Sequence, residues 1–318
     1  MIASAATSEP SQLDLPNALG FRRPKPEDIL WARPILFEAE RLGCEFCFGN
    51  IYAWCRKYGT EITQHSGFFL SRSIKQAIYC MPIGQGDLKD VIPLLSEDAK
   101  QRGAALRLYG LNAQDIPRLE EAYPGAFCIE KANPADFDFI YSQEDLATLA
   151  GKKFHQKRNH VARFMRECPG WFFEELTPAL LDEVLEMEKT WAEQNAARNP
   201  EGFAEELEAF ERSLRNFQTF GLRGALLREN GPGSRVIAFT MGEALSKYTF
   251  CTHYEKAYAE DYTGAYQMIN RCFAEETLDG FELINREEDL GHEGLRKAKL
   301  SYHPTQVLEK YYATFHSQ

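Results

Sequence analysis

Residues 253 to 302 contain acidic, basic and phenolic side chains of the types that acyl transfer requires. Attack on an activated ester needs a group that accepts a proton from the nucleophile and donors that stabilise the oxyanion. Candidate proton acceptors are Glu255 and Asp289, followed by His253, Asp261 and Glu288. Candidate stabilising groups are Arg296 and Lys299, one helical turn apart, and Tyr302 could protonate a leaving hydroxyl. Surface ion pairs and a polar loop are the alternative interpretation.

A second group of residues in the same stretch could bind substrate. Gly264 and Ala265 follow an expected strand and open an expected helix, where free backbone N–H groups favour an anionic group. A single glycine, without a glycine-rich run, leaves a second interpretation open: a helix start whose small residue permits close packing. Lys256 and Asn285 are the other candidate substrate-binding residues.

The densest positive patch lies in an expected helix over residues 152–167. At 3.6 residues per turn, Lys152, Arg163 and Arg166 fall on one polar face, opposite Phe154, Val161 and Met165. That face could bind the phosphates of tRNA or another polyanion. A solvated helix face is the alternative.

The elements that would position these residues repeat. Residues 236–243 and 248–256 alternate as paired strands, a helix follows from 266, and 281–285 is a short strand before the basic helix at 294–302. The first half shows the same order, with a strand at 77–83, a glycine-containing turn, a helix and a strand at 106–111, which indicates a diverged duplication. Residues 127–141 are expected to complete the first sheet. The expected division is a disordered lead-in over 1–20, one domain over 21–150 and a second over 151–318, opened by the basic helix.

Three short motifs near the C-terminus carry a family resemblance: Gly294-Leu295-Arg296-Lys297-Ala298-Lys299, Tyr302-His303-Pro304 and Glu309-Lys310-Tyr311. They resemble the C-terminal signature of the catalytic domain of phosphatidylglycerol lysyltransferases, and most of the chain resembles a soluble bacterial family of unassigned function related to that domain. The resemblance implies an α/β (α+β) fold of two tandem GNAT-like acyltransferase domains, each a mixed, mostly antiparallel sheet flanked by helices. Fem-type peptidyltransferases share this architecture.

These relatives move an amino acid from aminoacyl-tRNA to an acceptor amine or hydroxyl. The resemblance therefore implies an aminoacyl transferase whose partners are aminoacyl-tRNA and an acceptor that is a lipid headgroup, a peptide or a small molecule, with no cofactor. Two alternatives stay open. One is an acyl-CoA-dependent N-acyltransferase, for which coenzyme A would be the cofactor. The other is a non-catalytic module that binds a ligand or RNA on the same scaffold.

Composition narrows the class of protein. The chain has 318 residues, 44% hydrophobic and 26% charged, which is typical of globular domains. It has no apolar run long enough to span a membrane and no secretory signal at its start, and its eight cysteines indicate a reduced, cytoplasmic protein. A net charge of −11 restricts nucleic-acid binding to a local basic patch. Cys44 and Cys47 form a C-x-x-C without a second pair at zinc-ligand spacing, so no metal is expected.

Overall fold

The computed structural model describes residues 17–195 and 200–316. Residues 1–16 of the predicted lead-in lie outside the described residues. The first half of the chain contains α1 (Ile29–Glu38), α2 (Phe48–Tyr58), β1 (Thr60–His65), β2 (Phe68–Ser73), β3 (Ile78–Cys80), β4 (Ile83–Gly84), α3 (Leu88–Gln101), β5 (Arg107–Leu111), α4 (Asp115–Ala122), β6 (Phe127–Lys131), β7 (Asp138–Ser142) and α5 (Gln143–Thr148).

The second half repeats the alternation of helices and strands. It contains α6 (His155–Glu167), β8 (Phe172–Glu175), α7 (Leu181–Asn195), α8 (Pro200–Arg215), β9 (Arg223–Arg228), β10 (Val236–Ala244), β11 (Thr249–Ala257), α9 (Ala265–Cys272), β12 (Leu283–Asn285), α10 (Glu293–Leu300), β13 (Gln306–Leu308) and β14 (Tyr311–Phe315). A π-helical turn over Phe273–Thr277 continues α9.

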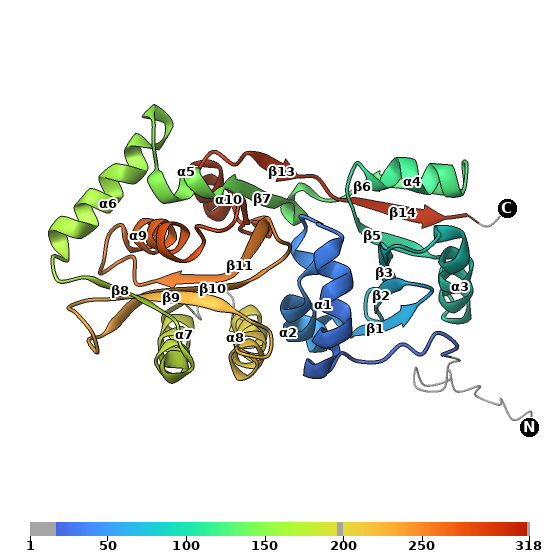
Figure 1. Ribbon diagram of the computed structural model, residues 1–318, viewed down its shortest axis with the longest axis horizontal. Coiled ribbons are helices and arrows are strands. Elements are labelled where there is room, and N and C mark those ends of the chain that lie inside the picture. The colour runs from blue at the N-terminus through green and yellow to red at the C-terminus, as the bar shows by residue number, and fades with distance from the viewer. Residues whose placement is uncertain (1–16, 196–199, 317–318) are drawn as a thin grey trace, which may run out of the picture.

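The strands form two mixed sheets in which most neighbours are antiparallel, as predicted. The first sheet has the order β1-β2-β3-β5-β14-β6, with β4 paired to β2, and the second has the order β13-β7-β12-β11-β10-β9-β8. The parallel pairs are β3 with β5 and β11 with β12. The two sheets lie side by side along the long axis of the molecule (Figure 1).

Sheet membership does not follow a single division of the chain. β14, from the C-terminal end, pairs with β5 and β6 of the first sheet, whereas β7 pairs with β12 and β13 of the second. The expectation that residues 127–141 complete the first sheet is therefore correct for β6 and wrong for β7. The segment 138–308 supplies the whole second sheet and is inserted between β6 and β14.

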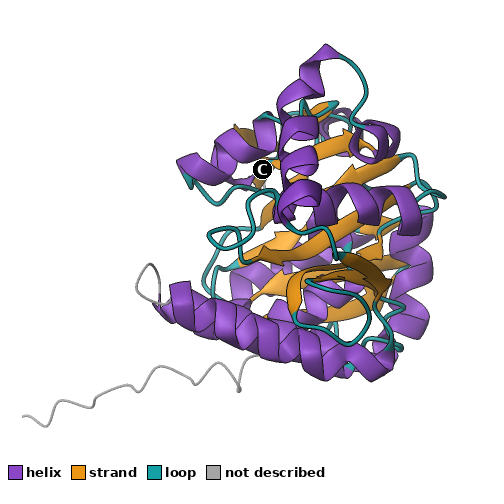
Figure 2. Ribbon diagram, turned by 90° about the vertical axis from the view of Figure 1, so that its left-hand side faces the viewer, coloured by secondary structure: helices purple, strands orange, loops and turns teal. Residues whose placement is uncertain are grey.

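Helices cover both faces of the second sheet. α7 and α8 lie on one face, and α9 lies on the other with α5 and α6 packed against it (Figures 1 and 2). α1 and α2 fill the space between the sheets, and α2 packs on α8. Phe48 and Tyr52 of α2 contact Phe220 edge to face, with ring centroids 5.7 and 5.1 Å apart. One hydrophobic core is therefore shared by residues of both halves.

Candidate active site

The centre of the second sheet opens between β11 and β12. The two strands pair in parallel over three positions, and the last pair is Cys251 with Asn285. β11 then continues to Ala257 while the chain after β12 turns away. Side chains occupy the space that opens: His253 lies 2.7 Å from Glu287, and Arg286 donates to Glu255 at 2.8 Å. The predicted residue Glu255 therefore lies where the strands diverge.

Arg286 is the cation at this opening. Its Nη2 donates to Glu255, and its guanidinium carbon lies 5.0 Å from the ring centroid of Tyr302 and 5.6 Å from that of Tyr141. Its Nη1 is buried and has no hydrogen-bond partner among the described residues. Leaving a buried donor unpaired costs free energy, so this N–H is available to an oxygen of a ligand.

Asn270, from α9, lies on the other side of Glu255. Its Nδ2 donates to Glu255 Oε2 at 3.2 Å, while its buried Oδ1 has no partner within the described part of the chain. The carboxylate of Glu255 is thus flanked by a donor on Arg286 and an acceptor on Asn270 that are both left unpaired by the described residues. An amino acid ester carries the complementary pair, a carbonyl oxygen and an amino group.

Lys157, from α6, reaches the same site. Its ammonium lies 3.8 Å from the ring centroid of Tyr302, and the residue is 7% exposed. Burial and the nearby charge of Arg286 lower the pKa of Lys157 to about 8, although Glu255 acts in the opposite direction. A lysine with this pKa is partly neutral near neutral pH and can accept a proton.

Tyr302, predicted as a proton donor, packs between these cations. Its ring meets that of Tyr141 edge to face at 6.4 Å, and the residue is buried. Burial raises the pKa of the Tyr302 phenol, so the hydroxyl stays protonated over the physiological range.

Lys299 supports this site by binding the backbone of the segment that carries Arg286. Its Nζ donates to the backbone carbonyls of Arg286, Glu287 and Glu288 at 2.6, 3.1 and 2.5 Å. An ammonium has three N–H donors, so all of them are engaged. Burial lowers the pKa of Lys299. The contacts give Lys299 a positioning role for the segment that carries Arg286, and the predicted contact with the oxyanion stays a prediction.

Asp289 and Arg296 form a second fixed contact. Arg296 Nε donates to the buried Asp289 carboxylate at 2.6 Å, and its Nη2 donates to the carbonyl of Pro134 at 2.8 Å. This ion pair joins α10 to the turn before it and to the residues that precede β7. The catalytic roles predicted for both residues stay predictions.

The predicted binding residues Gly264 and Ala265 lie where α6 crosses the start of α9. Gly264 has φ +92, and a Cβ placed there would lie 2.4 Å from the carbonyl oxygen of His160. Ala265 is fully buried. The contacts match the alternative interpretation, a small residue that permits close helix packing, and the substrate-binding role stays a prediction.

The other two predicted binding residues are also engaged. Lys256 donates to Glu206 at 2.8 Å and lies 4.0 Å from the ring of Trp191, near Glu188, whose pKa burial raises to about 7. Asn285 is fully buried and donates to the backbone of Leu42 and to Asp138, which ties the two halves together.

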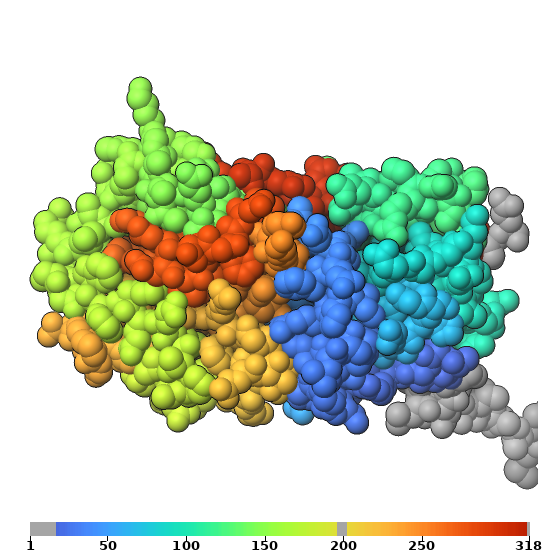
Figure 3. Space-filling model, viewed as in Figure 1, coloured from blue at the N-terminus to red at the C-terminus, as the bar shows by residue number. Residues whose placement is uncertain are grey.

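The predicted basic helix is present, as a 3-10 turn over Lys152–Phe154 followed by α6. Lys152, Arg163 and Arg166 are exposed, and the segment that carries them lies at the outer end of the second half (Figure 3). Arg163 and Arg166 lie 2.8 and 3.6 Å from the carboxylate of Glu167. Phe164 takes the buried position expected for Met165, which is 44% exposed.

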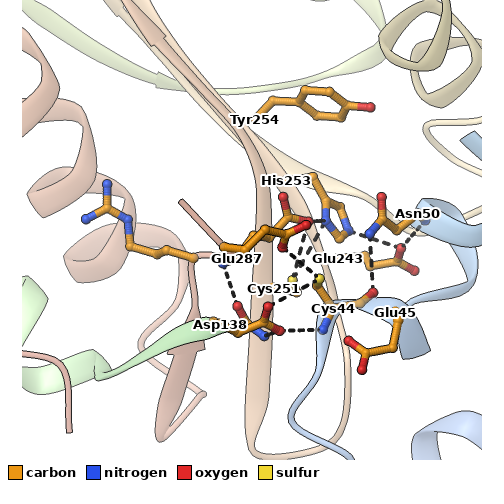
Figure 4. Close-up of polar contacts among 12 residues, drawn as sticks. Cys44, Glu45, Asn50, Asp138, Glu243, Cys251, His253, Tyr254 and Glu287 are labelled. Carbon is orange, nitrogen blue, oxygen red and sulfur yellow. Dashed lines mark hydrogen bonds and ion pairs between the residues drawn. The ribbon is translucent and has the colours of Figure 1, made fainter. Parts of the chain in front are cut away.

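A cluster of thiols and carboxylates occupies the junction of the two halves beside β11. His253 lies between Glu243 and Glu287, with Cys251 and Cys44 nearby (Figure 4). Burial raises the pKa of Cys47 to about 12 and that of Cys44 and Cys251 well above its usual value. As free thiols these cysteines are therefore poor nucleophiles.

A cleft of about 820 Å³ opens elsewhere, between the first half and β13. The end of α1, the turn containing Gly84 and Gln85, residues 112–115, Arg118 and residues 306–309 line it. None of its lining residues belongs to the site around Arg286. The pair at Arg286 and Glu255 is therefore identified by its chemistry and not by the size of a cavity.

Three residues of this site were absent from the sequence-based candidates: Arg286, Lys157 and Asn270. Lys157 carried a usable signal, because it shares a helical face with Phe154, Val161 and Phe164, which are all buried. A lysine within an apolar stripe is unusual unless it has a partner. Arg286 carried no such signal, since its burial depends on tyrosines from β7 and from the residues after α10.

Comparison with known proteins identifies a matching family and several similar structures. Residues 37–314 match the family described as phosphatidylglycerol lysyltransferase, C-terminal. A conserved protein of unknown function from Bacteroides thetaiotaomicron is 36% identical, with 94% of this chain and 100% of that chain covered and a TM-score of 0.88. L-PGS from Bacillus licheniformis is 16% identical over 93% of each chain, with a TM-score of 0.63. FemX is 9% identical over 93% of this chain and 97% of its own, with a TM-score of 0.56.

The last two likenesses concern the fold alone, and they confirm the predicted fold class. An uncharacterized protein from Mycoplasmoides gallisepticum is 22% identical over 213 residues, and the match covers 64% of this chain and 65% of that protein. No helix within the described ranges is long and apolar enough to cross a membrane.

Proposed function

The chain belongs to the phosphatidylglycerol lysyltransferase C-terminal family, and from this membership we propose that it transfers an amino acid from aminoacyl-tRNA to an amine or hydroxyl acceptor. The reaction site in this proposal is the opening between β11 and β12. The observation that carries it is the buried Nη1 of Arg286, which has no hydrogen-bond partner in the described ranges, beside Lys157, whose pKa is lowered to about 8.

Each group at the opening has a role in the proposed reaction. Arg286 Nη1 donates to the carbonyl oxygen of the amino acid ester and stabilises the oxyanion that forms there. Asn270 Oδ1 and Glu255 accept N–H groups from the α-amino group. Neutral Lys157 accepts the proton that the attacking amine or hydroxyl loses.

The proposed step balances without an additional reactant. A bond forms between the nucleophile and the carbonyl carbon, and the bond from that carbon to the ribose oxygen of tRNA breaks. The proton taken from the nucleophile returns to the ribose oxygen, either from Lys157 or from the phenol of Tyr302 with Lys157 restoring it. The route through Tyr302 would need a side-chain movement, because the Lys157 ammonium lies over the face of the ring, 3.8 Å from its centroid.

Lys152, on the 3-10 turn before α6, and Arg163 and Arg166, on α6, are the proposed contacts with tRNA phosphates. The segment supports this arrangement because it presents these cations outward and Lys157 inward. The tRNA body would then rest on the outer face of α6 and its aminoacyl end would reach the opening behind it. Phosphate contacts of this kind position a nucleic acid without reading its sequence.

The acceptor in this proposal is any amine or hydroxyl that reaches Arg286: a peptide, a small molecule or a lipid headgroup. The direct test is transfer of radiolabelled amino acids from a set of charged tRNAs to each class of acceptor, with and without the protein. Arg286→Gln should abolish transfer, whereas Arg271→Gln, which alters a cation on α9 paired with Glu275, should leave it unchanged.

Two results would contradict the proposal. One is transfer that survives Arg286→Gln in a folded protein. The other is an absence of transfer from any charged tRNA together with thermal stabilisation by coenzyme A, which would point to an acyl-CoA-dependent enzyme, since a ligand that binds the native state raises its stability.

A further inference from the structure

Four side chains of the kinds that bind zinc converge where the two halves of the chain meet. Ligand atoms of Cys47, Cys251 and His253 all lie within 4.8 Å of one another. Cys251 Sγ lies 3.7 Å from His253 Nδ1 and 4.0 Å from Glu287 Oε1. His253 Nδ1 lies 2.7 Å from the same oxygen of Glu287 (Figure 4).

These residues come from three separate segments. Cys47 is the N-cap of α2 in the first half, Cys251 and His253 are on β11, and Glu287 follows β12. Glu287 adopts φ +58, a left-handed conformation that is unfavourable for a residue with a side chain. Its backbone is held there by contacts with Asn285 and Lys299, so the fold keeps its carboxylate beside His253.

We propose that Cys47 Sγ, Cys251 Sγ, His253 Nδ1 and Glu287 Oε1 form a tetrahedral Zn²⁺ site. Ligands of zinc at its usual bond lengths are separated by roughly 3.5 Å for sulfur and nitrogen and roughly 3.4 Å for nitrogen and oxygen. In the structure, Cys251 Sγ lies 3.7 Å from His253 Nδ1 and 4.0 Å from Glu287 Oε1, slightly farther apart than ligands of zinc. His253 Nδ1 lies 2.7 Å from Glu287 Oε1, slightly closer. The group of mutually close ligand atoms comprises Cys47, Cys251 and His253, so a rotamer change of the Glu287 side chain would bring its carboxylate to the ion as the fourth ligand.

The carboxylate of Glu243 orients the imidazole of His253 for binding the metal ion. It accepts from the Nε2 side of His253 at 3.2 Å, which leaves Nδ1 to the metal. Asn50 N–H donates to Glu243 Oε1 at 3.1 Å, and Gly49 makes room, since a Cβ there would lie 2.6 Å from that oxygen. A carboxylate behind a metal-bound histidine is a common way to set its tautomer and orientation.

The neighbouring cluster around Cys44 does not offer a second site. Lys310 Nζ lies 2.8 Å from Asp138 and 3.8 Å from Cys44 Sγ, so a cation of the protein itself already neutralises that group. The C-x-x-C of Cys44 and Cys47 is therefore not a ligand pair. Cys47 instead finds its partner ligands in Cys251 and His253, which are two positions apart on β11 and which the fold brings next to it.

The proposed zinc is structural. Cys47 and Cys251 are 2% and 0% exposed and the His253 side chain is 6% exposed, and four protein ligands leave no position for a substrate. Because Cys47 caps α2 in the first half and the other ligands lie on β11 and just after β12, the ion would fasten the two halves to each other. Thiolate and imidazole ligands favour zinc over magnesium or calcium.

Metal content tests the proposal without reference to catalysis. The full chain, purified without chelator and again after incubation with zinc, should hold stoichiometric zinc by mass spectrometry. The double substitution Cys47→Ser with Cys251→Ser should remove it. Cys44→Ser, which changes a thiol in the adjacent cluster, should retain it. Loss of zinc from Cys44→Ser to the same extent would overturn the assignment of ligands.

The unaltered protein supplies a second test that does not depend on a variant folding. Chelator should lower the Tm and zinc should restore it, and cobalt in place of zinc should give the thiolate charge-transfer absorption of a tetrahedral site. Glu243→Gln should weaken zinc binding about 10- to 100-fold. A wild-type chain that takes up no zinc after reconstitution, and whose Tm is the same with and without chelator, would refute the site and identify His253 as an ordinary buried ion-pair partner.

Discussion

At the scale of single residues, the surroundings of a side chain decide its chemistry more than its type does. Lys157 lies within a run of lysines and arginines that as a whole faces solvent, yet it alone among them is buried against Tyr302. Burial disfavours its charged form, and this converts a surface cation into a group that exchanges protons near neutral pH. The proposed mechanism depends on that conversion.

Replacement of Lys157 by methionine should lower kcat about 100- to 10,000-fold, the usual contribution of a positioned proton acceptor. In the wild-type protein the pKa of Lys157 is lowered to about 8, so its neutral form gains population as pH rises through that value. The rate should therefore fall below pH about 8 and level off above it, and this limb should vanish in Lys157→Met. The measurement is kcat for transfer as a function of pH.

Lys153→Met provides the matched control for that experiment. Lys153 is a close neighbour in sequence, but its side chain is 46% exposed and pairs with Asp145. Its replacement should change neither kcat nor the pH profile. An unaltered pH profile in Lys157→Met would assign the proton transfer to another group.

The pair between Arg286 and Glu255 should dominate the stability of the opening. Both side chains are largely buried, with 12% and 13% exposed, so Arg286→Met leaves the carboxylate of Glu255 without its counter-charge. Removing one partner of a buried pair costs about 3–5 kcal/mol in the free energy of unfolding. Urea denaturation should show this decrease, whereas Arg271→Met, which breaks a partly exposed pair with Glu275 and a hydrogen bond to the carbonyl of Ala147, should cost about 1 kcal/mol. Equal decreases in both variants would count against a buried pair.

The sequence could identify Glu255 and Tyr302 but not the residues that complete the site with them. Alternation places Glu255 near the end of a central strand, and a motif singles out Tyr302. Arg286 falls in a segment whose local sequence predicts a polar loop, because nothing local shows that Tyr141 from β7 and Tyr302 from beyond α10 enclose it. Long-range packing of this kind has no signature in local periodicity.

At the scale of elements, α10 and the preceding turn serve to hold Arg286 in place. Lys299→Met should expose the effect, because three backbone carbonyls would no longer have a charged donor in a buried setting. The expected cost is about 3 kcal/mol or more in the free energy of unfolding, measured in urea. A catalytic lysine that contacted the oxyanion would give a different result: lowered kcat with unchanged stability. Lys297→Met, on an exposed pair of the same helix, is the control.

α6 has a buried face that carries Lys157 and an exposed basic face, and the exposed face can be tested independently of Lys157. Reversing the charge of Lys152, Arg163 and Arg166 to glutamate should weaken tRNA binding and flatten its dependence on salt, by roughly one unit of slope for each phosphate that the protein no longer neutralises. Stability should change little, since these side chains are exposed. Binding of tRNA that is unaltered at low salt would locate the nucleic-acid surface elsewhere.

Element order was predictable, whereas the packing of elements against one another was not. The paired strands at β10 and β11, the basic helix and the short strand at β12 all follow from alternation and helical spacing. The start of α9 shows the limit: Gly264 marks a helix N-terminus correctly, but the helix that crosses it there, α6, is invisible in local sequence. A glycine required for packing and a glycine required for an anion have the same local pattern.

At the scale of the whole molecule, the exchange of strands argues against two halves that fold alone. A fragment of residues 151–318 would lack β7, which lies between β12 and β13 in its sheet, and would retain β14 without its partners. The shared core that contains Phe48 and Phe220 would also be cut. We therefore expect this fragment to be unfolded by circular dichroism. A fragment of residues 132–309, which keeps every strand of the second sheet, should retain more structure.

The intact chain should accordingly unfold in one cooperative transition. Trp31 packs on the core that both halves share and Trp171 on the other core of the second sheet, so variants that keep only one tryptophan allow each core to be followed by fluorescence in urea. Both probes and far-ultraviolet circular dichroism should give the same midpoint, because the core between the sheets couples their unfolding. Midpoints that differ between the two tryptophans, or a fragment 151–318 with native-like circular dichroism, would instead support the independent domains that the division at residue 150 predicted. In that case the pairing of β7 and β14 across the junction would contribute little to the free energy of folding.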